Sequence, residues 1–65
     1  MVGQIKKLNE KGFGFIKCKE LNKDVFFYHK DVQNAEFDSL QEGDQVTFDQ
    51  EKNEKGLIAK NVRLV

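Results

Sequence analysis

Four turn signals divide this chain of 65 residues into short pieces, and no other feature constrains its fold as strongly. They combine Asn, Asp or Gly with polar neighbours, a composition typical of tight turns, and they occupy residues 9–12, 21–24, 42–44 and 53–56. The runs between them are rich in Ile, Val, Phe and Thr and cover residues 3–8, 12–19, 24–29, 45–50 and 57–64. The chain has no Pro, and no window keeps a helical period of 3.6 residues. Five short strands with tight links predict one all-β domain over residues 1–65, built as a small barrel or sandwich.

The longest stretch without a strand pattern covers residues 30–41. We expect a turn of 3₁₀ helix around residues 30–33, followed by a loop that contains Phe37. A domain of this size buries only about 60% of the surface that its unfolded chain exposes, so we expect marginal stability.

Composition excludes several classes of protein. No apolar run approaches the length of a membrane span, and the first residues contain no apolar signal segment. One Cys and one His allow neither an internal disulfide nor a four-ligand zinc site. Four acidic residues match no calcium loop in their spacing and are expected to be solvated loop charges; they are Asp24, Asp31, Glu36 and Asp38. The sequence therefore predicts a cytoplasmic protein with no metal, no cofactor and no membrane partner.

The formal net charge is zero, because 11 basic residues balance 11 acidic ones. This balance argues against a protein that grips polyanions by bulk charge alone. The charges are nevertheless unevenly distributed: residues 1–30 carry seven basic and three acidic side chains, and residues 31–65 carry four basic and eight acidic ones. The acidic half is either ordinary solvated surface or a surface that repels phosphates from one side of the domain.

The run from Gly12 to Cys18 alternates between two kinds of side chain. In a strand, successive side chains point to opposite faces, so Ile16 and Cys18 share one face with the small Gly14. The opposite face carries two aromatic rings and a lysine, namely Phe13, Phe15 and Lys17. Burying Lys17 without a partner would be costly, so the Ile and Cys face is expected in the core and the two rings outside. Cys18 is then a small core residue rather than a reactive thiol.

The run from Asp24 to His29 repeats this arrangement. Val25 and Phe27 suit the core, whereas Phe26, Tyr28 and Lys30 fall on the opposite face. Two neighbouring strands would thus present aromatic rings beside lysines, an arrangement that stacks unpaired bases and neutralises phosphates. The alternative is that the two faces are reversed, with the Phe rings in the core, Lys17 buried and Ile16 exposed.

The string from Lys11 to Ile16, followed by the run from Asp24 to His29, resembles the paired nucleic-acid-binding motifs of the bacterial cold-shock proteins. Further matches in the same order extend the resemblance over nearly the whole chain; they lie at residues 3–6, 9, 37–43, 46–48, 56 and 61–62. The resemblance implies a five-stranded antiparallel OB-type barrel, the cold-shock domain. It also implies binding of single-stranded RNA and DNA with little sequence preference, in the role of an RNA chaperone or a regulator of transcription or translation.

The resemblance also assigns roles to individual positions. The family's stacking positions are matched by Phe13, Phe15, Phe26 and Phe37. Lys11 matches a basic position beside the binding face, and Phe27 matches an interior position that a smaller aliphatic residue normally fills.

Departures from the family pattern in the first run, in the link that follows it and in the third run affect binding. Lys7 stands where the family usually has a stacking Trp, Leu8 replaces a Phe, and the link from Asn9 to Lys11 is one residue short, so the placing of Lys7 is uncertain by one residue. In the third run, Tyr28 replaces a usual His and His29 a usual Phe. Losing one Trp platform weakens oligonucleotide binding by about 5- to 150-fold, so we expect weaker and more salt-dependent binding than in a typical member.

The complete predicted site combines stacking rings with lysines near phosphates and consists of Lys6, Lys7, Lys11, Phe13, Phe15, Lys17, Phe26, Tyr28, His29, Lys30 and Phe37. No constellation of residues supports catalysis, so no enzyme activity is expected. The alternative function is a small β-barrel interaction module that uses the aromatic patch as a protein interface. The sequence favours a monomer but leaves open the oligomeric state and the choice between RNA and DNA.

Overall fold

The computed structural model describes residues 1–54 and 56–65, and its regular elements are strands joined by tight turns and two short 3₁₀ turns. The strands are β1 (Val2–Asn9), β2 (Phe13–Cys18), β3 (Lys23–Tyr28), β4 (Gln45–Asn53) and β5 (Gly56–Leu64). The 3₁₀ turns are η1 (His29–Asp31) and η2 (Phe37–Ser39). The prediction of an all-β fold is confirmed, and each strand lies within a few residues of its expected range. No helix in the described ranges is long and apolar enough to cross a membrane.

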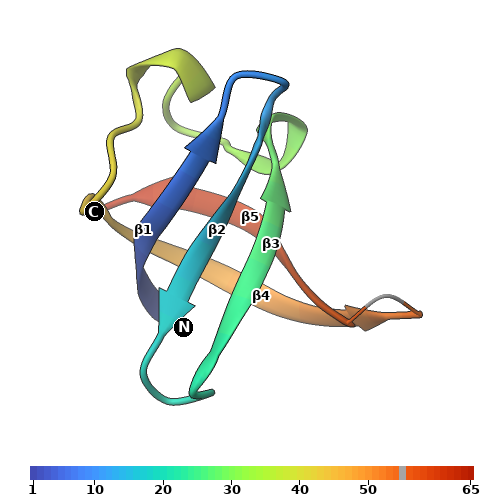
Figure 1. Cartoon of the computed structure of the whole chain (residues 1–65). Helices are drawn as coiled ribbons and strands as arrows, with labels where there is room; N and C mark the ends of the chain where they lie inside the picture. Colours follow the sequence, from blue (N-terminus) through green and yellow to red (C-terminus); the bar gives the residue numbers. More distant parts are fainter. Residues whose placement is uncertain (55) are drawn as a thin grey trace.

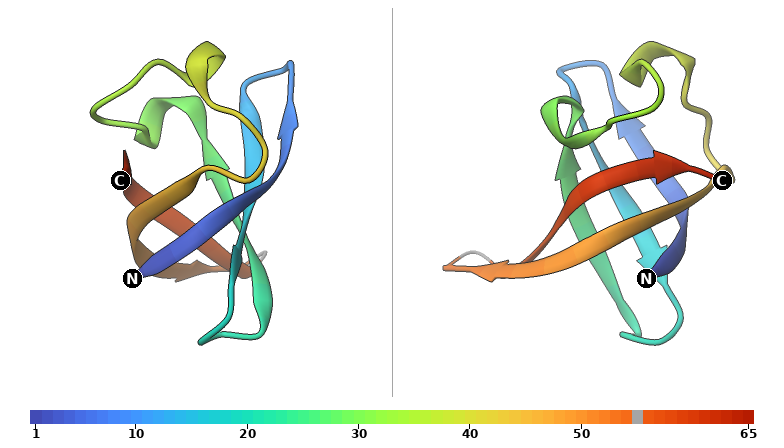
Figure 2. Two further views of the ribbon diagram at one scale, coloured as in Figure 1. Left: turned by 90° about the vertical axis from the view of Figure 1, so that its left-hand side faces the viewer. Right: turned by 180° about the vertical axis from the view of Figure 1, so that it is seen from behind.

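The strands close into a barrel in the order β1-β2-β3-β5-β4 (Figure 1). The pairs β1–β2, β2–β3, β1–β4 and β4–β5 are antiparallel. The barrel closes where β3 meets β5 in parallel, at Phe26 opposite Ile58. Beyond this contact, the ends of β4 and β5 project from the barrel (Figure 2). They are called the arm below and comprise residues 50–53 and 56–58, with Ile58 at the base.

Alternation of side chains along β2 and β3 builds the core. Ile16, Val25 and Phe27 are fully buried, and Cys18 is 1% exposed. Lys17 is exposed, and Phe48 lies in the core opposite these residues. The expected assignment of the two faces is therefore confirmed, and the reversed arrangement is wrong.

A β-bulge in β1 determines which of its lysines faces the same side as the rings of β2. Ile5 pairs with Ile16 and Lys7 pairs with Phe15, so Lys6 is the extra residue between them. After the bulge, Leu8 pairs with Gly14 and packs against the core. The bulge thus lets Ile5 and Leu8 point inward while Lys7 stands beside Phe15 on the outer face.

Gly14 lets β1 and β2 pair closely over the core. A Cβ atom at this position would lie 2.6 Å from the Lys7 carbonyl oxygen and 2.9 Å from Cε1 of Phe27. Both neighbours are held in place, one in the backbone and one in the fully buried ring.

We expect Gly14→Ala to destabilise the fold by about 1–3 kcal/mol, the usual cost of forcing extra atoms into a packed interior. In so small a domain this lowers the melting temperature by about 4–8 °C per kcal/mol. Thermal unfolding followed by circular dichroism measures the change. A variant with the melting temperature of the wild type would show that the strands can move apart here without loss of stability.

The segment between β3 and β4 passes over one end of the barrel (Figure 2). Its 3₁₀ turn η1 begins at His29, one residue before the expected start, and a second turn, η2, forms where a loop was expected. Gln33 ties the segment to β5: its backbone N–H donates to the Val62 carbonyl at 2.8 Å, and its Nε2 donates to Asn61 Oδ1 at 2.7 Å. Asn61 in turn donates to Asp49 Oδ2 at 2.8 Å. These bonds hold the start of the segment against β5, and farther along it Phe37 packs against the core.

Candidate nucleic-acid interface

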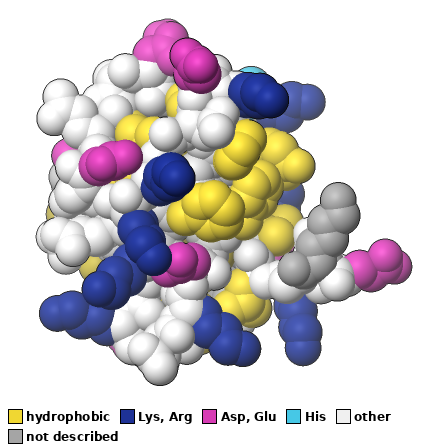
Figure 3. Space-filling view, in the orientation of Figure 1, with side chains coloured by type: hydrophobic (Ala, Val, Ile, Leu, Met, Phe, Trp, Pro, Cys, Tyr) yellow, Lys and Arg dark blue, Asp and Glu magenta, His cyan; other side chains and the backbone are white. Residues whose placement is uncertain are grey.

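Four aromatic rings from β2 and β3 form one cluster on the outer face of the barrel. Phe13 lies opposite Tyr28, and Phe15 lies opposite Phe26. The centroid of the Phe26 ring is 5.4 Å from that of Phe13, 5.6 Å from that of Phe15 and 4.7 Å from that of Tyr28. These four residues are called the aromatic platform below, and Figure 3 shows hydrophobic side chains gathered over β2 and β3. The ring of Phe26 lies at its centre.

The rings of the platform support one another and remain accessible. Phe13, Phe15 and Phe26 are half-buried, and Tyr28 is 51% exposed. Phe15 and Tyr28 meet Phe26 edge to face, with interplanar angles of 69° and 87°. Edge-to-face contacts are favourable and restrict ring rotation. These contacts hold the four rings together on one accessible face.

One exposed lysine borders the platform, and two more lie in the turns that adjoin its strands. Lys7 stands opposite Phe15 and, with Phe13 and Gly14, borders a hollow of about 130 Å³. Lys11 lies in the turn between β1 and β2, where its backbone N–H donates to Asn9 Oδ1 at 2.9 Å. Lys30 lies in η1, two residues beyond Tyr28. These ammonium groups place positive charge at the border of an apolar surface.

The two other predicted lysines lie near Asp24, and one of them, Lys6, is ion-paired with it. Asp24 lies opposite Lys17 in the β2–β3 pair, and its Oδ2 accepts a hydrogen bond from Lys6 Nζ at 2.9 Å. The expectation of a solvated loop charge holds in part for Asp24, whose side chain is 43% exposed but lies in β3 and is ion-paired. It is wrong for Asp31, whose side chain is only 19% exposed and pairs with Lys60 at 3.5 Å.

His29 and Phe37 form a separate group of rings. Their ring centroids lie 6.4 Å apart, and Phe37 lies 6.0 Å from the core ring of Phe27. The two rings border a hollow of about 450 Å³ at the end of the barrel, together with Lys11 and the carboxylates of Glu10, Glu36 and Asp38. The predicted set of stacking residues is thus divided into the aromatic platform and this acidic hollow.

The arm contributes residues that sequence reasoning did not assign to the site. Asn53, Leu57 and Ile58 border a hollow of about 330 Å³ together with Phe15, Phe26 and Tyr28. Leu57 and Ile58 are half-buried. The sequence predicts a strand at these positions but gives no sign that they lie beside the platform. The parallel contact between Phe26 and Ile58 brings them to the platform, and no local pattern encodes that contact.

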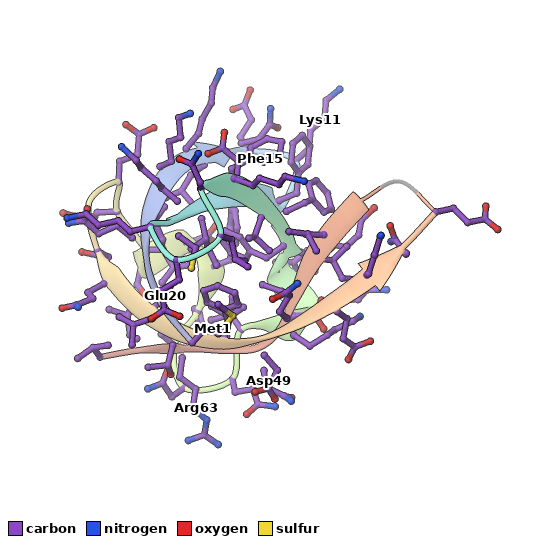
Figure 4. The ribbon with its side chains drawn as sticks, turned by 90° about the horizontal axis from the view of Figure 1, so that it is seen from below. Met1, Lys11, Phe15, Glu20, Asp49 and Arg63 are labelled. Atoms are coloured by element: carbon purple, nitrogen blue, oxygen red, sulfur yellow. The ribbon has the colours of Figure 1, made fainter. Side chains whose placement is uncertain are left out.

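Opposite sides of the barrel differ in character. Viewed from below in Figure 4, Phe15 and Lys11 lie on one side, and Asp49 and Arg63 lie on the other. Within the described ranges, no group of three or more His, Cys, Asp or Glu side chains could hold a metal ion. The aromatic rings and their lysines are therefore the chemistry that this surface offers a ligand.

Comparison with known proteins identifies the family. Residues 1–65 match the family model described as the 'Cold-shock' DNA-binding domain. The chain belongs to the cold-shock domain family. It is 45% identical over 56 residues to a cold shock-like protein of Aquifex aeolicus, covering 86% of this chain and 80% of that protein. It is 44% identical over 63 residues to cold shock-like protein CspB of Escherichia coli, covering 95% of this chain and 89% of the relative.

A solved structure supports the same assignment. The structure described as drosophila Unr CSD456 superimposes on 98% of this chain with a TM-score of 0.81 and 29% sequence identity. This chain corresponds to 26% of that longer chain. The cold-shock barrel expected from the sequence is thus confirmed, and the domain is a nucleic-acid-binding domain of the cold-shock type.

Proposed function

We propose that this cold-shock domain binds single-stranded RNA and DNA with little sequence preference, by stacking bases on the aromatic platform. The cross-strand register of Phe13 with Tyr28 and Phe15 with Phe26 carries the proposal, because it gathers four accessible rings on one face. Every base has a flat π face, so stacking tolerates any sequence. A duplex hides those faces, so the platform selects unpaired strands.

Lysines supply the remainder of the affinity. The whole chain has no net charge, so attraction depends on local charge at Lys7, Lys11 and Lys30. Stacking contributes about 1–3 kcal/mol per base, and each neutralised phosphate of a single strand adds about 0.7 to the slope of log affinity against log salt. A binder that takes unpaired bases without reading them disfavours RNA secondary structure, which is the action of an RNA chaperone.

Titration with single-stranded and duplex ligands tests the proposal. We expect Tyr28 fluorescence and the ring resonances of Phe13, Phe15 and Phe26 to respond to heptathymidylate and heptauridylate. A duplex of the same length should bind at least about tenfold more weakly, because its bases are already stacked. Ring resonances that stay unchanged at saturating oligonucleotide, or equal affinity for the duplex, would overturn the proposal and leave a protein interface as the alternative.

We expect Asp24→Asn to strengthen binding of single strands. The change releases Lys6 from its ion pair and removes the carboxylate opposite Lys17. An exposed ion pair is worth about 0.2–1 kcal/mol, so affinity should rise by about 1.5- to 5-fold at low salt. The salt slope should steepen by about 0.7 for each new phosphate contact.

Glu42→Gln is the matched control for Asp24→Asn. It changes the net charge by the same amount at an exposed position before β4. Fluorescence titration over a salt series compares the two variants. An equal gain in both would mean that net charge, rather than the release of Lys6, governs the affinity.

A further inference from the structure

A further hollow, of about 550 Å³, lies beside the aromatic platform, between β3 and the arm. We call it the β3–arm cleft, and the residues used below are Phe15, Leu21, Lys23, Phe26, Lys52 and Leu57. Phe15 and Phe26 belong both to the platform and to the cleft. Figure 2 shows how the arm extends away from the barrel, and in Figure 3 further hydrophobic surface lies at the base of the arm with basic side chains beside it.

The sequence explains why the strands separate here. The inner face of β4 changes from buried Val46 and Phe48 to exposed Gln50 and Lys52. The inner face of β3 likewise changes from buried Val25 to exposed Lys23. Charged side chains cannot be buried in the core without partners, so the core ends at this level and the inner faces open to solvent.

The cleft combines apolar side chains with two lysines, which suit the base and the phosphates of one nucleotide. Leu21 and Leu57 are half-buried, and with the sides of the Phe15 and Phe26 rings they provide apolar contact for a base. Lys23 and Lys52 provide two ammonium groups for phosphates. Asp24 also borders the cleft, but its carboxylate is already paired with Lys6 at 2.9 Å. The volume lies within the range of small-molecule sites, about 300–1,000 Å³.

We propose that the β3–arm cleft is an additional nucleotide site, which takes the next nucleotide of a strand bound on the platform. This inference depends on the proposed function, because Phe15 and Phe26 lead the strand from one surface to the other. Lys23 and Lys52 hold the phosphates on either side of that nucleotide. The domain thus covers more of the strand than the platform alone can cover.

A length series of oligothymidylates from four to nine nucleotides tests the inference. The wild-type protein should gain about 5-fold or more in affinity at the length that first reaches the cleft. At that length, and not below it, the methyl resonances of Leu21, which borders the cleft but not the hollow beside Tyr28, should shift. A double variant, Lys23→Gln with Lys52→Gln, should lose most of this gain and lower the salt slope by about 1.4. Lys19→Gln, in the turn between β2 and β3 and outside the cleft, is the control and should keep the gain.

The outcomes separate the two proposals. If short oligonucleotides move the platform resonances but longer ones add no affinity and leave Leu21 unmoved, the cleft is not a nucleotide site and the platform function stands. If no oligonucleotide moves the platform resonances, the proposed function itself fails. If the control loses the gain as the double variant does, the effect is one of general charge and the inference is wrong. A Leu21 shift that follows protein concentration without oligonucleotide assigns the cleft to a second copy of the chain and also overturns the inference.

Discussion

Phe26→Ala is expected to lower the affinity for heptathymidylate by about 10- to 150-fold. Stacking of a base on an aromatic side chain is worth about 1–3 kcal/mol, and Phe26 is the ring at the centre of the platform. Its removal deletes one stacking surface and takes away the support of three neighbouring rings. Fluorescence titration at a temperature well below the melting transition of the variant measures the loss.

Phe26→Leu distinguishes stacking from loss of apolar surface. Leucine keeps much of the side-chain volume at this half-buried position but has no π face. We expect it to fold nearly as well as the wild type and still to bind at least about 5-fold more weakly. If Phe26→Leu binds like the wild type, apolar contact rather than base stacking accounts for the affinity.

The platform could be predicted from the sequence because one residue decides the orientation of β2. Lys17 is exposed, so its strand neighbours Phe13 and Phe15 had to share its outer face, and the same alternation placed Phe26 and Tyr28 outside. The alternation of side chains along a strand is a local property, so it can be read from the sequence without knowing the fold. It also located the core residues of these strands.

His29 and Phe37 show where this local rule ends. β3 stops at Tyr28, and η1 begins at His29, so the two-residue period of the strand no longer sets the direction of the next side chain. The ring of His29 lies near Phe37 and over Gly12, where the backbone has a φ of +97°. The point at which a strand gives way to a 3₁₀ turn depends on tertiary contacts, such as the bond from the His29 N–H to the Gly12 carbonyl at 2.8 Å.

Long-range register accounts for the remaining features that the sequence did not reveal. The ion pair of Lys6 with Asp24 joins residues 18 positions apart and requires the bulge in β1. The cleft requires the parallel contact of β3 with β5, which joins Phe26 to Ile58. Neither the ion pair nor the cleft depends on a pattern within one segment, so the sequence alone does not predict them.

Lys7→Trp is expected to strengthen binding of heptathymidylate by about 5- to 150-fold, the largest gain that one substitution offers here. The register assigns Lys7, rather than its bulged neighbour Lys6, to the place beside Phe15 on the outer face. Position 7 is exposed, so an indole can lie beside Phe15 without displacing core atoms. It would extend the platform onto β1 by one stacking surface.

The salt dependence identifies the source of that gain. Stacking is insensitive to salt, whereas a Lys7–phosphate contact contributes about 0.7 to the salt slope, so Lys7→Trp should bind more tightly and with a shallower slope. Lys7→Gln, which removes the charge without adding a ring, should show the shallower slope with weaker binding. Lys6→Trp is the positional control and should gain little, because the bulge sets Lys6 apart from the position opposite Phe15. A larger gain from Lys6→Trp than from Lys7→Trp would mean that the strand approaches β1 one residue earlier than the register indicates.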